Sequence, residues 1–278
     1  MFENTSLDIN INTDLAHQIL TGFLRTELNR MGFTRAVIGL SGGIDSALSC
    51  FLAAHALGPE NVLAVRMPYK TSSADSLEHA QLVIDATGVQ SLTVEISEMA
   101  DALIGKFPDM DPVRKGNIMA RCRMIVLYDQ SNAFRGLVVG TGNKTEILLG
   151  YTTLFGDSAC ALNPLGDLYK TQVRQLSQAM GVPAPIIAKP PSADLWSGQT
   201  DEAELGFTYA DVDRLLYLLV DQRYSPADCV EAGFPQAFVE AVVRRVQRNQ
   251  FKRVLPPIAK LGNRTVGYDF LYLRDWGT

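Results

Sequence analysis

The sequence from Arg35 to Leu57 reads RAVIGLSGGIDSALSCFLAAHAL and predicts a strand, a glycine turn and a helix in succession. Residues 36–40 are apolar without polar alternation, which is typical of a strand buried on both faces of a parallel sheet. Residues 47–57 are typical of a helix that ends before Gly58-Pro59. The turn between them would gather free backbone N–H groups and the positive end of the helix dipole. We therefore expect this turn to bind an anion, most naturally phosphate.

The turn itself is the hexapeptide Ser41-Gly42-Gly43-Ile44-Asp45-Ser46. It lacks the Lys that follows the glycines of a Walker A loop, and its spacing differs from the G-x-G-x-x-G of dinucleotide-binding folds. A plain alternative is a Gly-Gly turn capped by Ser41 and Asp45, as any strand–helix connection can have. The complete hexapeptide, set between a predicted strand and a predicted helix, favours phosphate binding.

Length and composition describe an ordinary globular protein. The 278 residues allow one large α/β domain or two small ones, and 47% of them are hydrophobic against 20% charged. The formal net charge of -5 provides no basic surface for nucleic acid, so we expect no nucleic-acid partner. The four cysteines form no C-x-x-C pair, which argues against a zinc site or a disulfide framework and fits a reducing cytosol.

No segment has the uninterrupted apolar length that a membrane span needs, and the first residues, Met1-Phe2-Glu3-Asn4, lack the pattern of a leader. We therefore expect a cytoplasmic protein without a membrane partner.

Further apolar runs along the chain predict the rest of the fold. Buried strands are predicted at residues 62–65, 91–95 and 136–140, separated by helical patterns, and this alternation indicates an α/β fold with a doubly wound parallel sheet. Residues 13–31 and the stretch from residue 112 are predicted helices that flank the sheet. The part after residue 209 is predicted to be helical, with helices at 209–222, 226–231 and 235–251.

Two arginines, Arg66 and Arg121, are predicted to have different roles because of their positions in the predicted elements. Arg66 follows the strand at 62–65, at the end where open α/β sheets bind ligands, so we favour a site role over a solvated surface arginine. Arg121 lies in a predicted helix among aliphatic residues, where the plain interpretation is an arginine whose charge reaches solvent.

A second site-like loop, Thr141-Gly142-Asn143-Lys144-Thr145-Glu146, follows the strand at 136–140. Its acid, Glu146, would share the sheet edge with Asp45. Where Mg²⁺ binds phosphate, it is usually held by one or two carboxylates together with phosphate oxygens and water, so these two acids form a candidate metal site. Either acid could instead be a helix-start acid that complements the dipole.

Two polar segments are candidates for loops that close over a ligand. Residues 70–76 are small and polar, and residues 192–202 are polar and contain a glycine without clear periodicity.

The hexapeptide resembles the SGGxDS loop of the N-type ATP pyrophosphatases, and several further motifs resemble one branch of them, the NAD+ synthetases, over nearly the whole chain. The resemblance implies an adenine nucleotide alpha hydrolase-like fold. It also implies synthesis of NAD+ from deamido-NAD+, ATP and ammonia through an acyl adenylate, with release of AMP and pyrophosphate. The motifs are residues 140–146, Gly150-Tyr151, Phe155-Gly156-Asp157, residues 163–173, residues 191–195 and residues 201–206.

The resemblance also implies roles for individual residues. ATP would be bound by Leu40, Ser41, Gly42, Gly43, Ile44, Asp45, Ser46, Arg66, Thr141, Lys170 and Ser192. Mg²⁺ would be held by Asp45 and Glu146, and deamido-NAD+ would be contacted by Arg121, Asp157 and Lys252. The catalytic residues would be Asp45, Lys170 and Asp157, the last of which would orient ammonia or accept a proton.

The chain departs from the family pattern on the acceptor side. Many relatives have Lys where this chain has Leu154, Asp where it has Ala161, and a His-Lys pair where it has Phe251-Lys252. An alternative is therefore an amide ligase of the same fold that acts on a different carboxylate. A third hypothesis is a nucleotide-binding regulator without catalysis, against which the retained Asp45, Glu146 and Lys170 argue.

The resemblance implies a single domain over residues 1–278 without an N-terminal glutaminase domain, since about 35 residues precede the first strand. Free ammonia would then be the nitrogen source, unless a separate glutaminase chain delivers it. Members of the family are homodimers with acceptor sites at the subunit interface, which predicts a homodimer here.

Overall fold

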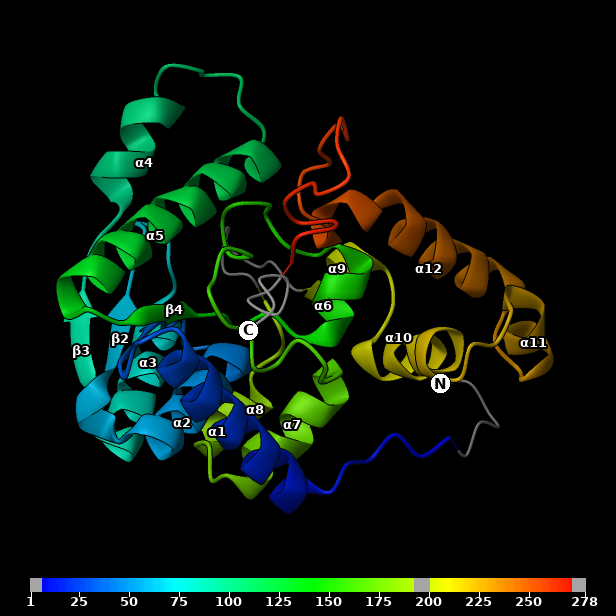
Figure 1. Cartoon of the computed structure of the whole chain (residues 1–278), viewed down its shortest axis with the longest axis horizontal. Coiled ribbons are helices and arrows are strands. Elements are labelled where there is room, and N and C mark those ends of the chain that lie inside the picture. The colour runs from blue at the N-terminus through cyan, green and yellow to red at the C-terminus, as the bar shows by residue number, and fades with distance from the viewer. Residues whose placement is uncertain (1–6, 193–200, 272–278) are drawn as a thin grey trace.

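The computed structural model of the chain describes residues 7–192 and 201–271. Its parallel sheet has the spatial order β3-β2-β1-β4, so the chain extends the sheet on one side of β1 and then returns to the other side (Figure 1). Such a reversal opens a crevice at the carboxyl ends of β1 and β4, where α/β sheets bind ligands. The strands are β1 (Ala36–Gly39), β2 (Val62–Arg66), β3 (Gln90–Thr93) and β4 (Leu137–Val139).

Both faces of the sheet are buried, as the unbroken apolar strands predict. Ala36 and Ile38 of β1 face one core, and Val37 faces another on the opposite side. The predicted doubly wound α/β sheet is thereby confirmed. One face is covered by α1 (Thr13–Arg30), α2 (Ile44–Leu57), α3 (Ala74–Thr87) and α7 (Lys170–Ala179), and the other by α4 (Ser97–Ile104) and α5 (Pro112–Phe134).

The C-terminal part is helical, as predicted, and lies beside the sheet with α6 and α7 between the two (Figure 1). It has its own core, in which Leu149 and Tyr169 from the neighbouring part meet the apolar sides of its helices. Its helices are α9 (Asp201–Leu205), α10 (Tyr209–Leu216), the π-helix η2 (Tyr217–Asp221), α11 (Pro226–Glu231), α12 (Gln236–Arg248) and η3 (Gln250–Arg253). The remaining helices are η1 (Pro59–Asn61), α6 (Lys144–Leu149) and α8 (Ala184–Ala188).

Some boundaries differ from those predicted. Helix α2 begins three residues early, at Ile44, because Gly43 is extended and acts as its N-cap, so Asp45 and Ser46 lie in the first helical turn. The helix predicted for residues 209–222 changes to a π-helix at Tyr217, whose carbonyl accepts from Gln222 N. Asp201 and Glu202, predicted to lie in a loop, open α9. The rest of that predicted loop, residues 193–200, lies outside the described residues.

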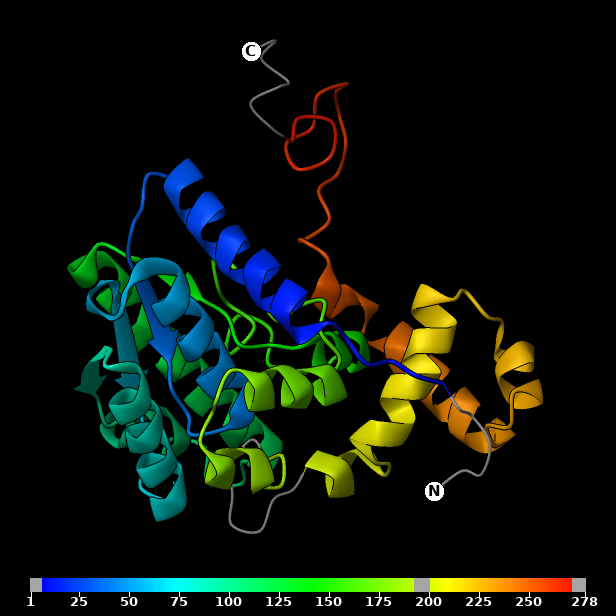
Figure 2. The same ribbon diagram turned by 90° about the horizontal axis from the view of Figure 1, so that it is seen from below.

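Seen from below, α1 crosses one side of the molecule, and residues 254–271 project beyond η3 (Figure 2). In the part of the chain that the structure describes, no helix combines the length and apolar character required to cross a bilayer.

Candidate active site

A cavity of about 490 Å³ lies at the carboxyl ends of β1, β2 and β4, where the strand order predicts a ligand site. Most of the residues predicted to form the site line it, whereas Gly42 and Arg121 do not. The predicted residues on its wall are Leu40, Ser41, Gly43, Ile44, Asp45, Ser46, Arg66, Thr141, Glu146, Asp157, Lys170, Ser192 and Lys252.

Hydrogen bonds of Ser41 and Ser46 fix the conformation of the turn after β1. Ser46 Oγ donates to Gly43 O at 2.9 Å and accepts from Ser41 N at 3.2 Å, while Ser41 Oγ accepts from Gly43 N at 3.3 Å. Helix α2 has no side-chain cap, and its first intrahelical bond comes from Ala47 N to Gly43 O. The amides of its first turn therefore lack intrahelical acceptors and remain available to an anion.

Gly42 shapes this turn from behind rather than from the cavity wall. Its φ is +80°, and a Cβ at this position would lie 2.2 Å from the carbonyl oxygen of Ser76 in α3. Both the backbone conformation and the close approach require glycine here. Gly42 therefore has a structural role in this turn, and its predicted ATP contact stays a prediction.

The turn after β4 carries the second acid. Asn143 is fully buried and caps α6: its Oδ1 accepts from Glu146 N at 3.0 Å, and Glu146 Oε2 accepts from Asn143 N at 3.3 Å. The other end of the same amide, Nδ2, donates to Asp45 Oδ1 at 2.8 Å. This capping box therefore fixes Glu146 and connects its loop to the first turn.

Lys170 lies between the two acids, Asp45 and Glu146. Its ammonium contacts Asp45 Oδ2 at 2.5 Å and Glu146 Oε1 at 3.0 Å, and all three side chains are largely buried. Burial alone would lower the pKa of Lys170, but the two carboxylates outweigh it and hold the pKa above its usual value. Burial of the carboxylate raises the pKa of Glu146 to about 7, although the neighbouring ammonium of Lys170 opposes this effect. The two predicted metal ligands thus face one cavity.

This donor set fits Mg²⁺. Within residues 7–192 and 201–271, no three His, Cys, Asp or Glu side chains form a group that would hold a metal by themselves. Two carboxylates that converge on one cation are nevertheless what Mg²⁺ uses when substrate phosphates and water complete its shell. The ammonium of Lys170 lies between Asp45 and Glu146 and supplies positive charge that compensates part of their negative charge.

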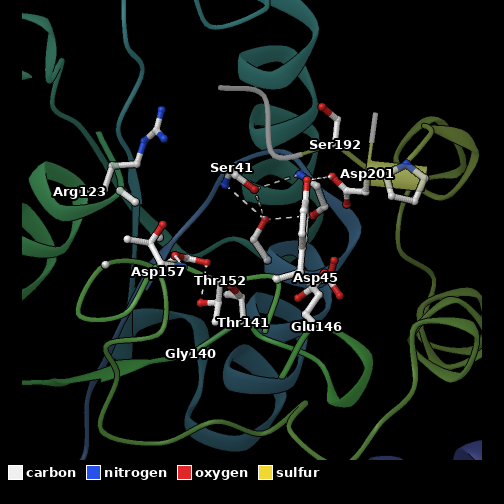
Figure 3. A pocket seen from close by; sticks show the side chains of 18 of the residues that line it. Ser41, Asp45, Arg123, Gly140, Thr141, Glu146, Thr152, Asp157, Ser192 and Asp201 are labelled. Atoms are coloured by element: carbon white, nitrogen blue, oxygen red, sulfur yellow. Dashed lines mark hydrogen bonds between the residues drawn. The ribbon is translucent and has the colours of Figure 1, made fainter. Parts of the chain in front are cut away.

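Asp157 forms a second polar corner of the cavity. Its carboxylate accepts from Thr153 N at 2.7 Å and from Thr152 Oγ1 at 3.0 Å (Figure 3). Asp157 is exposed to the cavity in the single chain, while the protein around its carboxylate displaces part of its hydration and so raises its pKa against the opposing effect of these hydrogen bonds. The structure thus brings Asp157 into the same cavity as Asp45 and Glu146.

Lys252 reaches this corner from the C-terminal part. Its ammonium donates to Gly150 O and Thr152 O, each at 2.7 Å, and Arg253 donates to Leu148 O at 2.7 Å. These cations satisfy carbonyls at the end of α6, where the helix dipole favours positive charge. The basic residues after α12 therefore hold the chain around Asp157.

The predicted arginines differ in their positions. Arg66 lines the cavity and donates from Nη1 to Gln81 Oε1 at 2.8 Å, while its buried Nε has no hydrogen-bond partner in the described structure. Arg121 is exposed and donates to Leu154 O at 3.1 Å. The structure of the single chain therefore does not bring the predicted Arg121 contact to the cavity.

Three further residues of this region have no predicted role. Arg123 lines the cavity on the side away from Asp45 (Figure 3), and it donates to Met67 O. Asp201 is buried and accepts from the hydroxyls of Tyr151 and Tyr209, each at 3.1 Å. Asp213 is buried and accepts from Thr145 Oγ1 and Thr171 N. No local sequence pattern marks these three residues, because their contacts join segments that are far apart in the chain. The N-x-x-E pattern of Asn143 and Glu146, by contrast, is local and is typical of a helix start.

Comparison with known proteins shows similarity to one family over nearly the whole chain. The sequence model of the NAD synthase family matches residues 16–256. An NH(3)-dependent NAD(+) synthetase of Trichlorobacter lovleyi is 60% identical over 269 residues, which cover 97% of this chain and 98% of that protein. Another with this name, from Chlorobium phaeovibrioides, is 54% identical over 97% of each chain.

Two solved structures are also similar to this chain in fold and in sequence. An NMN synthetase from Francisella tularensis has a TM-score of 0.80 and 31% identity, covering 90% of this chain and 100% of that chain. An NH3-dependent NAD synthetase from Campylobacter jejuni, in complex with the nitrate ion, has a TM-score of 0.77 and 32% identity with the same coverage. The chain therefore belongs to the NAD synthase family.

Proposed function

We propose that this enzyme amidates deamido-NAD+ with ammonia at the expense of ATP, through an acyl adenylate, and releases NAD+, AMP and pyrophosphate. One observation carries the proposal. The ammonium of Lys170 contacts the carboxylates of Asp45 and Glu146 near the uncapped N-terminus of α2, in a cavity that Asp157 also lines. The named relatives support the ammonia-dependent synthesis of NAD+. The choice of deamido-NAD+ as the acceptor and of an acyl adenylate as the intermediate goes beyond what the names of these relatives say.

In the first half of the reaction, the acceptor carboxylate attacks the α-phosphorus of ATP and pyrophosphate leaves. The free amides at the start of α2 would bind the leaving pyrophosphate, and Lys170 and the unpartnered Nε of Arg66 would add positive charge. Asp45 and Glu146 would hold Mg²⁺, which when bound neutralises phosphate charge. This step replaces oxide, a poor leaving group, by AMP.

In the second half, ammonia attacks the acyl carbon. A C–N bond forms, the C–O bond to AMP breaks with its electron pair on AMP, and one proton leaves the nitrogen. Asp157 would accept that proton, because its carboxylate faces the cavity and loss of part of its hydration raises its pKa above the ordinary value.

Incubation with ATP, Mg²⁺, ammonium and deamido-NAD+ tests the proposal. We expect NAD+, AMP and pyrophosphate in equal amounts. Release of ADP and phosphate would reject it. An inactive nucleotide-binding regulator would release neither pair, and retention of the Asp45, Glu146 and Lys170 cluster argues against it.

A second candidate acceptor has specific support. Leu154 and Ala161 replace polar residues of the family pattern, and a structural neighbour is named NMN synthetase. The corresponding acceptor would be nicotinate mononucleotide. Pyrophosphate release measured with each acceptor at equal concentration separates the two, and a kcat/KM at least tenfold higher for deamido-NAD+ would exclude the mononucleotide as the main acceptor.

We further propose that residues 1–278 act as one domain and that two copies form a homodimer. Thr145 of α6 donates to Asp213 of α10 at 2.6 Å, which links the sheet to the helical part. Ile19 of α1 and Ile125 of α5 are apolar and more than half exposed, and a partner could cover them. Sedimentation analysis tests the dimer. The cytoplasmic location and the separate glutaminase stay predictions.

A further inference from the structure

Behind the wall of the main cavity lies a fully buried carboxylate, Asp213 of α10, to which the proposed reaction gives no part. Asp213 accepts three hydrogen bonds, one from Thr145 Oγ1 at 2.6 Å and two from Thr171 N and Thr171 Oγ1, each at 2.8 Å. In the described part of the chain, none of these three residues lines the cavity. Any effect of Asp213 on the reaction must therefore pass through the two threonines.

The two threonines adjoin two charged residues of the proposed site. Thr145 precedes Glu146 in the first turn of α6, and Thr171 follows Lys170, the first residue of α7. Thr145 also contacts α7 directly, because its Oγ1 accepts from Lys170 N at 3.0 Å. The carboxylate of Asp213 thus connects the start of α6 to the start of α7.

The start of α7 depends on these contacts. The first amides of a helix have no intrahelical acceptor, and the N-cap residue of α7 is Tyr169, whose hydroxyl instead donates to Asp221 Oδ2 at 2.6 Å. Thr145 Oγ1 accepts from the amide of Lys170, and Asp213 Oδ2 accepts from the amide of Thr171. A carboxylate at this end also complements the helix dipole. The backbone that carries the Lys170 side chain is therefore fixed from the helical part.

A second acid of the same helical run, Asp221 at the end of η2, makes a parallel set of contacts. Its Oδ1 accepts from Lys144 Nζ at 2.8 Å, and its Oδ2 accepts from Tyr169, which directly precedes Lys170. In a regular α-helix, a separation of eight residues would rotate Asp221 by about 80° from Asp213. The wider turn of the π-helix reduces that rotation, so both acids can face α6 and α7.

We propose that Asp213 and Asp221 are positioning residues, which hold the first turns of α6 and α7 so that Glu146 and Lys170 converge in the cavity. The inference rests on the proposed function and adds residues that act on adenylation without touching substrate. Asp213 has the larger effect, because it is fully buried, whereas the side chain of Asp221 is 32% exposed. Loss of a residue that orients such groups typically costs about 10- to 100-fold in activity.

Variants of Thr145 and Asp213 test the inference. Thr145→Val removes the hydroxyl at nearly constant volume, and Thr145→Ser keeps it. Asp213→Asn retains one acceptor oxygen but turns N–H donors toward the donors that Asp213 now satisfies. Pyrophosphate release with ATP, Mg²⁺, ammonium and deamido-NAD+ is divided by the folded fraction, which urea unfolding measures, so that loss of stability does not count as loss of turnover.

Per folded molecule, kcat should fall roughly 10- to 100-fold in Thr145→Val and in Asp213→Asn, and less than tenfold in Asp221→Asn. Thr145→Ser should stay within threefold of wild type. The KM for deamido-NAD+ should change less than twofold in all four variants, because the substituted residues do not line the described cavity. A fall in kcat without a rise in this KM is the result expected of positioning.

The matched control is Asp211→Asn, which removes the same charge from α10 but lies at the helix start, where Asp211 accepts from Thr208 Oγ1 at 2.7 Å. Its kcat should equal that of wild type. Wild-type kcat per folded molecule in Thr145→Val would overturn the inference, as would an equal loss in Thr145→Ser, and this pair decides the test if Asp213→Asn does not fold. Absence of pyrophosphate release by the wild type would instead reject the proposed function.

Discussion

The side-chain amide of Asn143 donates to Asp45 Oδ1 at 2.8 Å and so joins the turn after β4 to the turn after β1. The same side chain accepts from Glu146 N at 3.0 Å as the cap of α6. One fully buried residue therefore sets the distance between the two carboxylates proposed to share Mg²⁺.

Asn143→Ala should lower kcat/KM for ATP roughly 10- to 100-fold, as loss of a residue that orients metal ligands does. It should also destabilise the fold by about 1 kcal/mol through loss of the helix cap. Pyrophosphate release and urea unfolding measure the two effects. Ser225→Ala is the matched control, because Ser225 caps α11 with a similar capping box at an exposed position. Equal activity losses in both variants would show that capping alone is responsible.

Asp45→Asn should reduce turnover at least 100-fold and leave the unfolding free energy within about 1 kcal/mol, because Lys170 keeps Glu146 as its partner. Lys170→Met should behave differently. It leaves two buried carboxylates without a cation, which should destabilise the fold by about 3–5 kcal/mol.

Steady-state pyrophosphate release and urea unfolding of the two variants measure this contrast. If Asp45→Asn retains more than a tenth of the turnover, Asp45 does not belong to the proposed metal site.

The sequence was informative where function depends on local pattern. The SGGIDS turn lies between an apolar strand and a helix, and Glu146 follows another strand, so chain order alone placed both at one sheet edge. Asp213 and Asp201 gave no such signal. Their partners, among them Thr145 and Tyr151, come from distant segments, and only tertiary packing brings them together.

Helix boundaries were predicted less well, because one residue's backbone conformation decides them. The extended Gly43 starts α2 at Ile44.

Gly42→Ala should destabilise the protein by roughly 2 kcal/mol or more and raise the KM for ATP. The new Cβ would meet the Ser76 carbonyl at 2.2 Å, and alanine disfavours a φ of +80°. Gly32→Ala is the matched control, since Gly32 also has a φ of +80° but has no atom within 4 Å of an added Cβ.

The difference between the two variants isolates the clash with α3 from the backbone strain. Urea unfolding measures the difference in unfolding free energy, and ATP titration at constant acceptor concentration measures the difference in the KM for ATP. Equal unfolding free energies for the two variants would mean that α3 yields freely to the added atom.

Asp213 predicts a pH dependence of stability. Burial raises the pKa of Asp213 from 3.8 to about 6, even though Thr145 and Thr171 donate to it. The folded state therefore holds this proton more tightly than the unfolded chain, so stability should fall as pH rises from about 4 to about 6. The difference between the two pKa values corresponds to roughly 3 kcal/mol.

The effect of Asp213 should appear as the difference between wild type and Asp213→Asn in urea unfolding at pH 4, 5, 6 and 7. Subtraction removes the contributions of Glu146 and Asp157, whose pKa values loss of hydration also raises. Asp228→Asn is the control of opposite sign: hydrogen bonds from Ser225 lower the pKa of Asp228, so its contribution should be lost as pH falls. Parallel pH curves for wild type and Asp213→Asn would show that the buried carboxylate is ionised at no net cost, and that Thr145 and Thr171 fully compensate its burial.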